Sequence, residues 1–381
     1  PPGDYTVVET DPPGFFSTGD IVPPNDNQIP VTLISGTNST GNDFLDAQNP
    51  DINVTKTFVN ASEIDTNGNF TITYRVSVIN PAISAVVYDL SDTPSPDTNV
   101  TINGATVTGF DNLSFTNAGP YILADDATVA ANATNVYVLT LDATLSESAR
   151  AGTSSVSLCA DLPQDLEAGQ GLYNEATVQF GTNNTTITVR DCGNIPPWLL
   201  LDKTFVSASE PDLNGNFTVV YNVTVENIGG SSDTYDLSDT PSFDTNITVN
   251  GGAVSDHVVL VLTNDGPYTL AVNEPIAAGG THTYVLTLSA TLNSSVLAGA
   301  SSVTVCGEGS GTPVAGEGLF NGASLSFNTN TITVSTNDCG DIPPFILIDK
   351  TFVSATEPNL SGNFTATYDI TVVNVGGSIG S

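Results

Sequence analysis

Hydrophobic and polar residues alternate along many short segments of the chain. Two clear cases are Phe70-Thr-Ile-Thr-Tyr-Arg-Val-Ser-Val and Phe217-Thr-Val-Val-Tyr-Asn-Val-Thr-Val. Alternation with a period of two is typical of strands that bury one face. Clusters of Gly, Asn, Asp and Pro, which are turn residues, separate these segments. The pattern predicts an all-β protein built of tandem antiparallel β-sandwich domains of the immunoglobulin-like type.

The strand pattern repeats along the chain. Lys56-Thr-Phe-Val recurs at Lys203 and at Lys350, so both intervals are 147 residues (203 − 56 and 350 − 203). Tyr88-Asp-Leu-Ser-Asp-Thr-Pro recurs at Tyr235 in the same register. So many matching positions at one spacing indicate tandem copies of one domain. We therefore predict a first repeat over residues 51–197, a second over 198–344 and an incomplete third over 345–381.

The junctions between the repeats and the incomplete third repeat indicate how the domains are connected. Asn194-Ile-Pro-Pro-Trp198 and Asp341-Ile-Pro-Pro-Phe345 join neighbouring repeats, and a double proline predicts a semi-rigid connection. The third repeat stops shortly after Val375-Gly-Gly-Ser, before its Tyr-Asp-Leu-Ser-Asp segment. It cannot close a sandwich by itself. Either the protein continues, or another molecule completes the sheet.

The net charge limits the classes of molecule that the chain can bind. The chain holds 6 Lys plus Arg against 41 Asp plus Glu, a net charge of −35. Such a surface repels nucleic acid and anionic lipid and attracts cations such as Ca²⁺. There is no apolar run long enough to insert directly into a membrane. The hydrophobic share of 39% in alternating runs argues against a disordered acidic tail.

Cysteine occurs twice in each full repeat. Cys159 and Cys192 recur 147 residues later as Cys306 and Cys339. Paired, equivalent placement predicts one disulfide per repeat and therefore an oxidising, extracellular setting. The alternative is a metal site, but two Cys per repeat and two His in the whole chain cannot build one in every repeat.

The three lysines of the chain all occupy one repeat position. Counting by twos places each on the apolar face of its strand, where an unpaired ammonium is costly. Inward Asn and Asp residues lie in the same repeats, which makes an intramolecular Lys–Asn isopeptide bond a candidate, with the buried acid polarising the amide. The candidate sets are Lys56, Asn174 and Asp92 in the first repeat and Lys203, Asn321 and Asp239 in the second. The alternative is a lysine at the rim of the sandwich, paired with a carboxylate.

Two further kinds of site are suggested by short motifs. Oxygen-rich loops are candidate Ca²⁺ ligands, with Asp65 and Asn67 in the first repeat and Asp212 and Asn214 in the second, although a plain hairpin turn explains the same residues. Asn-x-Thr sequons at Asn69, Asn216 and Asn363 share one repeat register and are candidate glycosylation sites.

No catalytic arrangement is found. His257 and His282 lie in one repeat and have no counterparts in the other, so we expect isolated surface or turn histidines. A Ser-His-Asp site would need a framework that the repeats do not provide. The sequence predicts no enzyme and no resident cofactor other than a candidate Ca²⁺.

Two segments of the chain resemble known families of extracellular surface proteins. Lys203-Thr-Phe-Val with Asn214-Gly-Asn-Phe-Thr-Val-Val-Tyr-Asn-Val-Thr-Val-Glu-Asn-Ile-Gly-Gly resembles tandem surface repeats of the domain-of-unknown-function-eleven family. Residues 1–50, with Pro2-Gly-Asp-Tyr-Thr-Val-Val-Glu and Gly41-Asn-Asp-Phe-Leu-Asp, resemble the closing strands of an SdrD B-like (collagen-adhesin B-type) domain. Both resemblances imply extracellular stalks, adhesins and fibres.

We therefore expect a structural repeat protein of the cell exterior. It would build a filament, sheath or surface fibre by association with copies of itself. The alternative is a spacer stalk of a large adhesin whose ligand-binding domain lies outside residues 1–381. A secreted hydrolase with accessory repeats would need a catalytic domain outside the same range.

Overall fold

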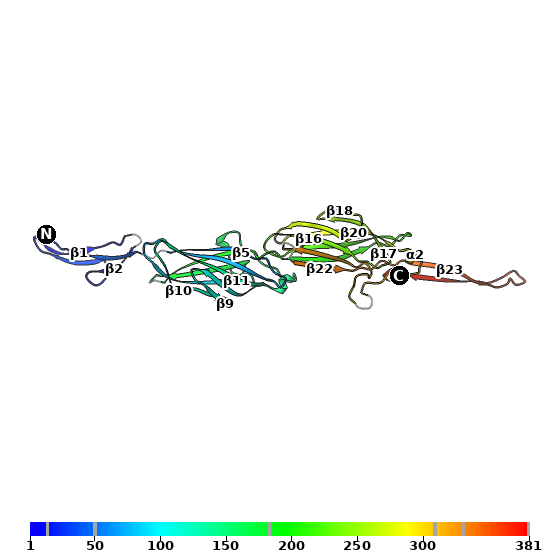
Figure 1. Cartoon of the computed structure of the whole chain (residues 1–381), viewed down its shortest axis with the longest axis horizontal. Helices are drawn as coiled ribbons and strands as arrows, with labels where there is room; N and C mark the ends of the chain where they lie inside the picture. Colours follow the sequence, from blue (N-terminus) through cyan, green and yellow to red (C-terminus); the bar gives the residue numbers. More distant parts are fainter. Residues whose placement is uncertain (13–14, 49–51, 182–183, 308–310, 329–331, 379–381) are drawn as a thin grey trace. The chain divides into compact units, whose positions relative to one another are not determined.

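The computed structural model describes residues 1–12, 15–48, 52–181, 184–307, 311–328 and 332–378 (Figure 1). The chain forms two compact units. The first comprises Pro1–Ser62, Phe70–Thr144 and Cys159–Gly193, and the second comprises Glu63–Asn69, Leu145–Leu158 and Asn194–Ser381. Nearly all regular structure in the described residues is β-strand. The predicted fold class, an all-β protein with several antiparallel β-sandwich domains, is confirmed.

The first unit contains one complete sandwich of two sheets. The order of the four-stranded sheet is β10-β7-β12-β13, and that of the five-stranded sheet is β5-β6-β11-β8-β9. The strands are β5 (Asn53–Ala61), β6 (Asn69–Asn80), β7 (Val86–Pro94), β8 (Val100–Gly109), β9 (Leu113–Phe115), β10 (Tyr121–Val129), β11 (Ala133–Leu145), β12 (Leu172–Phe180) and β13 (Thr185–Gly193). The short 3₁₀ turn η1 (Pro163–Asp165) precedes β12, whereas the short helix α1 (Glu147–Arg150) lies in the Leu145–Leu158 segment of the second unit.

The second unit contains a sandwich with the same plan. Its four-stranded sheet has the order β19-β16-β21-β22, and its five-stranded sheet has the order β14-β15-β20-β17-β18. The strands are β14 (Leu199–Ala208), β15 (Asn216–Asn227), β16 (Asp233–Pro241), β17 (Ile247–Asp256), β18 (Leu260–Leu262), β19 (Tyr268–Ile276), β20 (Thr281–Leu292), β21 (Asn321–Phe327) and β22 (Ile332–Asp338). The short helix α2 (Ser294–Leu297) follows β20.

The alternating pattern fills the core between the two sheets. In β6, Phe70, Ile72, Tyr74, Val76 and Val78 are all buried, while the residues between them are exposed or half-buried. Strand β15 repeats this arrangement in the second sandwich. Because successive side chains of a strand point to opposite faces, the period of two read from the sequence maps directly onto inside and outside.

The remaining strands form two-stranded pairs. In the first unit, β1 (Gly3–Val8) pairs with β3 (Gln28–Leu33), and β2 (Phe15–Asp20) pairs with β4 (Phe44–Gln48). In the second unit, β23 (Ile346–Ala355) pairs with β24 (Ala366–Asn374) as an antiparallel hairpin. None of the helices in the described chain is long and apolar enough to cross a membrane.

Candidate functional site

A buried lysine and a buried aspartate meet between the sheets of the first sandwich. Lys56 lies on β5 opposite Val76, and its Nζ contacts Oδ2 of Asp92 on β7 of the facing sheet. Neither side chain is exposed to solvent. The Tyr74 ring lies under the ammonium, with 4.8 Å between Nζ and the ring centroid. The lysine therefore lies inside the core and not at the rim of the sandwich.

The asparagine of the predicted set lies on the neighbouring strand. Strand β12 pairs with β7 so that Asp92 faces Ala176, and Asn174 lies two residues along on the same face. Asn174 is fully buried, and neither its amide nitrogen nor its carbonyl oxygen has a hydrogen bond of normal geometry. It is nevertheless close enough to Asp92 to favour the ionised carboxylate. A buried amide without hydrogen bonds is costly and calls for an explanation.

Burial disfavours charge on both members of the Lys56–Asp92 pair. Loss of hydration lowers the pKa of the Lys56 ammonium, although attraction to Asp92 opposes the shift. The same loss of hydration raises the pKa of the Asp92 carboxyl, again opposed by its partner. Both shifts favour a neutral amine beside a protonated acid. These are the protonation states that attack of the amine on an amide carbonyl requires.

The second sandwich contains the same arrangement. Lys203 Nζ on β14 contacts Asp239 Oδ2 on β16, again with no side-chain exposure. Asn321 on β21 is fully buried, and its amide atoms likewise have no hydrogen-bond partner. Burial lowers the pKa of Lys203 and raises that of Asp239. The ring of Tyr221 lies 4.8 Å from Nζ.

The third lysine is in a different environment. Lys350 lies on β23, where its side chain is exposed, and its Nζ lies 4.2 Å from the centroid of the Tyr368 ring. The positions 147 residues after Asp239 and Asn321 fall beyond residue 381. Residues 1–381 therefore include the lysine of this repeat but not the positions of its Asp and Asn.

Disulfides join the cysteines within each repeat. Cys159 is bonded to Cys192 and Cys306 to Cys339, with Cα–Cα distances of 5.9 and 6.0 Å. Each bond ties the loop before the penultimate strand of the sandwich to the end of its last strand: Cys192 lies in β13, and Cys339 directly follows β22. The two cysteines of each disulfide therefore lie on either side of β12 or β21, the strand that carries the asparagine of the Lys–Asp–Asn group.

The candidate Ca²⁺ loops are tight turns held by their aspartates. Asp65 Oδ1 accepts hydrogen bonds from the backbone N–H groups of Asn67 and Asn69, at 2.9 and 2.7 Å. Asp212 makes the equivalent bonds to Asn214 and Asn216. Bonding to these N–H groups lowers the pKa of both carboxyls, with the bond from Asn69 or Asn216 as the largest cause. The carboxylates therefore already hold the hairpin, and Ca²⁺ binding stays a prediction.

The candidate glycosylation residues lie in the same turns. Asn69, Asn216 and Asn363 are exposed. The side-chain nitrogens of Asn69 and Asn216 donate to Asp65 and Asp212, at 3.3 and 3.2 Å. A glycan would have to form on an amide that takes part in the turn, and glycosylation also stays a prediction.

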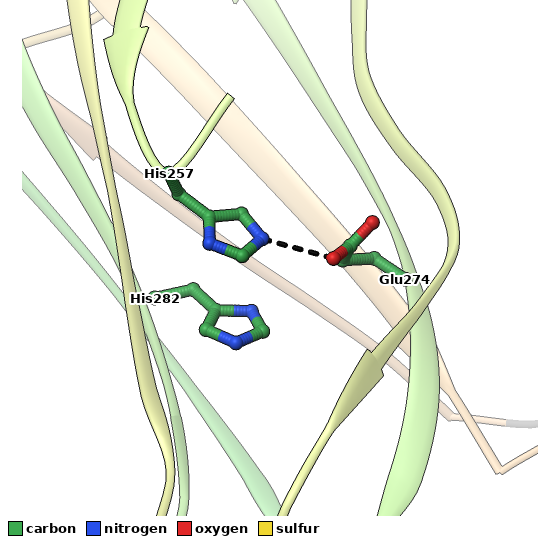
Figure 2. A group of neighbouring side chains, drawn as sticks. All are labelled: His257, Glu274 and His282. Atoms are coloured by element: carbon green, nitrogen blue, oxygen red, sulfur yellow. Dashed lines mark hydrogen bonds and ion pairs between the residues drawn. The ribbon is translucent and has the colours of Figure 1, made fainter.

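The expectation of isolated histidines is wrong. His257, just after β17, and His282 on β20 stack with 3.8 Å between ring centroids and 15° between planes. Figure 2 shows Glu274 of β19 beside them, its Oε1 3.0 Å from His257 Nε2. His282 Nδ1 is 2.7 Å from the hydroxyl of Tyr235. Burial, followed by the neighbouring His257, lowers the pKa of His282.

The three residues of this cluster do not recur in the first repeat. The residues 147 positions earlier are Phe110, Ala127 and Asn135, none of which resembles its counterpart chemically, apart from the polar Asn135. Only the pairing of β17 with β20, together with β19 from the facing sheet, brings the three groups together. Sequence spacing alone gave no indication of it.

Comparisons with known proteins leave the family open. No protein family model matches the chain, and no curated protein matches it. The resemblance to the two surface-repeat families therefore stays a prediction, and what holds is the presence of several β-sandwich domains.

Several solved structures show distant likeness. The exo-chitosanase CsxA of Amycolatopsis orientalis is 11% identical over 79% of this chain and 27% of its own, with a TM-score of 0.21. The transglutaminase of red sea bream is 9% identical over 76% and 30%, with a TM-score of 0.20. Domains D2 and D3 of the major pilin SpaD from Corynebacterium diphtheriae are 12% identical over 72% and 82%, with a TM-score of 0.22. The chain thus spans less than a third of the first two proteins, and TM-scores this low carry no argument about function.

Proposed function

We propose that this chain is a structural repeat protein of the cell exterior that builds a filament, sheath or surface fibre from copies of itself. It acts mechanically and is not an enzyme on external substrates. The observation that carries the proposal is the buried Lys–Asp–Asn group, which recurs with a disulfide in two sandwiches of the same plan. Such repetition suits a protein whose task is to resist extension.

The Lys–Asp–Asn groups are proposed to form isopeptide bonds. The proton of the Lys56 ammonium passes to Asp92, and the acid then donates a hydrogen bond to the Asn174 carbonyl oxygen. The neutral Nζ attacks Cγ of Asn174, a C–N bond forms, the Cγ–Nδ2 bond breaks, and ammonia leaves with the proton from Nζ. No oxidant or other reactant is needed. Lys203, Asp239 and Asn321 repeat the reaction in the second sandwich.

The position of the proposed bond explains its mechanical effect. Lys56 lies on the first strand of the first sandwich and Asn174 on the strand before its last. A bond between them links residues 56 and 174 directly. Tension applied along the chain at the two ends of the sandwich would pass through that bond, and the residues between would not extend. The disulfide to Cys192 continues this protection into the last strand.

The extracellular location is supported by chemistry. Disulfides persist in oxidising surroundings and are rare in the cytosol. The net charge of −35 keeps such a surface hydrated and disfavours contact with nucleic acid and anionic lipid.

The β23–β24 hairpin offers an apolar face for the proposed self-association. Tyr221 is fully buried in the second sandwich, but its repeat counterpart Tyr368 is 48% exposed. Likewise Phe217 is buried, and its counterpart Phe364 is exposed. This apolar face matches the inner face of a sandwich and is proposed to be covered by strands of a second copy. The adhesin-stalk alternative has this face covered by more of the same chain.

Electron microscopy of the native protein tests the proposal. Long filaments with a regular axial repeat are expected, and isolated particles of fixed length would favour the stalk. Phe352→Asp, on the apolar face, should abolish filaments, whereas Thr351→Asp, exposed on the opposite face of the regular part of the same strand, should not. Filaments that persist in Phe352→Asp would overturn the role given to the hairpin.

A further inference from the structure

The cluster of His257, Glu274 and His282 joins the two sheets of the second sandwich. His257 directly follows β17 and His282 lies on β20, both of the five-stranded sheet, whereas Glu274 lies on β19 of the four-stranded sheet (Figure 2). One nitrogen of each imidazole and one carboxylate oxygen lie within 4.8 Å of one another. Three donors from three strands therefore converge on one point.

The kind of donor selects the kind of ion. Two imidazoles and one carboxylate suit Zn²⁺ and similar divalent transition metals, whereas Ca²⁺ and Mg²⁺ prefer sites made only of oxygen. Three protein ligands also leave one position of a tetrahedral ion for water or an external ligand. The acidic surface alone would bind Ca²⁺ weakly at many places. The histidine cluster differs in chemistry from that surface.

The geometry needs only a small rearrangement. Two tetrahedral ligands at about 2.0–2.1 Å from Zn²⁺ lie roughly 3.3 Å apart. His257 Nε2 and Glu274 Oε1 are already 3.0 Å apart, and a metal would replace the hydrogen bond between them. Both side chains are partly exposed, at 23% and 30%, so an ion can enter and the groups can adjust.

A second hydrogen bond orients one of the rings. The Tyr235 hydroxyl lies 2.7 Å from His282 Nδ1 and also 2.7 Å from the Tyr284 hydroxyl. Histidine ligands usually have a partner of this kind, which fixes the tautomer and the direction of the ring. The hydrogen bonds of the Tyr235 hydroxyl thus hold the His282 ring from the core side, while the metal-binding atoms of the cluster stay partly exposed.

The first repeat shows that the sandwich does not need these three residues. At the equivalent positions it has Phe110, Ala127 and Asn135. Phe110 packs against Tyr137 with 5.5 Å between ring centroids, and Asn135 Nδ2 donates to the Tyr88 hydroxyl at 2.8 Å. The same place in the same fold is therefore closed by an apolar contact and a hydrogen bond. All three ligands appear together in the second repeat only.

We propose that His257, Glu274 and His282 form a binding site for one divalent transition-metal ion of the Zn²⁺ class, which bridges the two sheets of the second repeat. The metal connects the two sheets of this sandwich in addition to the Lys203–Asp239–Asn321 group. The first repeat has Phe110, Ala127 and Asn135 at the three equivalent positions. The proposal does not depend on the isopeptide bonds or on self-association.

Titration of the chain with Zn²⁺ tests the site. The buffer contains millimolar Ca²⁺, which occupies weak sites on the acidic surface. We expect one equivalent of Zn²⁺ to bind and to raise the melting temperature of the second repeat while leaving the first unchanged. Co²⁺ should give the visible absorption of a four-coordinate site, and Zn²⁺ should displace it. Absence of a stoichiometric Zn²⁺ site under these conditions overturns the proposal.

The first repeat supplies the control variant. His257→Phe, Glu274→Ala and His282→Asn together introduce the residues that this fold already accepts at those positions. The triple variant should lose the equivalent of Zn²⁺ and the Co²⁺ absorption. Glu274→Gln keeps the size of the side chain and should weaken binding at least tenfold, so the test does not rest on one variant. Unchanged Zn²⁺ binding in both variants would assign the metal to the acidic surface and contradict the site.

Discussion

The Nζ nitrogen of Lys56 contacts the Oδ2 oxygen of Asp92 in the core of the first sandwich, and neither side chain is exposed to solvent. Taking two charges out of water is costly, and hydrophobic residues in their place are often as stable or more so. A stability argument alone therefore does not explain why the pair recurs as Lys203 and Asp239. The proposed reaction with the neighbouring asparagine would account for it.

Removing the acid should prevent the proposed bond in one repeat only. In Asp92→Ala, the intact mass should rise by about 17 Da relative to the value expected from the substitution alone, because one ammonia is retained. The bond in the second repeat should still form. The matched control, Asp89→Ala, removes an exposed carboxylate from the same strand and should leave both bonds intact. A mass equal to that expected with both bonds would show that Asp92 is not needed.

Amine labelling should distinguish the three lysines. In the folded protein, an acylating reagent should modify Lys350, which is exposed, and spare Lys56 and Lys203, which are buried. After reduction and denaturation Lys56 and Lys203 should remain unmodified, because their nitrogens are in amides. Peptide mass spectrometry gives the result. Labelling of both residues in denaturant would mean that they form ion pairs only.

Loss of one disulfide should destabilise one repeat. Cys159 and Cys192 are 33 residues apart, and closing such a loop contributes about 3 to 4 kcal/mol in the chain-entropy model. Replacing both with Ser should lower the free energy of unfolding of the first repeat by about that amount, measured by urea denaturation. The Cys306 and Cys339 double variant should do the same for the second repeat. Equal destabilisation of both repeats by either double variant would contradict this assignment.

The turn at Asp212 should add a pH dependence at low pH. Bonds from backbone N–H groups lower the pKa of this carboxyl below its ordinary value of 3.8. The folded state thus binds fewer protons than the unfolded state, so the stabilisation is present above pH 3.8 and is lost as the pH falls through the lowered pKa. Asp212→Asn should be less stable than the wild type at pH 7, and the difference should shrink on acidification.

The third repeat shows that asparagine is a suitable replacement for Asp212 in this test. Asn359 occupies the position of Asp212 there, and its Oδ1 accepts from the N–H groups of Ser361 and Asn363 at 2.9 and 3.0 Å. The turn therefore forms without a titrating group. Glu210→Gln removes one negative charge from the same hairpin and serves as control in thermal melts from pH 2 to pH 7. A parallel pH profile for Asp212→Asn and wild type would rule out the titration of Asp212.

The fold was predictable because one physical rule decides it. Strands that bury one face alternate in sequence, so the buried Phe70, Tyr74 and Val78 could be read directly from the chain. The same counting assigned Lys56 and Asn174 to the inner faces, where the structure has them. Their contact with Asp92 depends only on which strands face one another in a two-sheet sandwich. The same residue types recur 147 residues later, which showed that their inward positions are not accidental.

The histidine cluster could not be predicted in the same way. His257 and His282 come together through the pairing of β17 with β20, and a bulge between Val249 and Gly251 shifts that register by one residue. Glu274 arrives from the facing sheet, whose pairing is also irregular near Leu237. Bulges change which face a residue occupies, and the alternation of hydrophobic residues does not reveal them.

The oxygen-rich turns illustrate a different limit. Aspartate and asparagine around a glycine suit both a Ca²⁺ loop and a hairpin turn, since each needs oxygen acceptors in a tight backbone. The structure shows that Asp65 and Asp212 bond to their own backbone. No residue pattern distinguished the two cases beforehand.

The intact mass of the purified, fully reduced chain tests the central claim most directly. Reduction removes the contribution of the two disulfides, so any remaining deficit reports other chemistry. We expect a mass about 34 Da below that of the sequence, because one ammonia is lost for each Lys–Asn bond. Fragmentation should then yield branched peptides that join Lys56 to Asn174 and Lys203 to Asn321. A mass equal to that of the unmodified sequence would contradict the claim that these sandwiches are covalently closed.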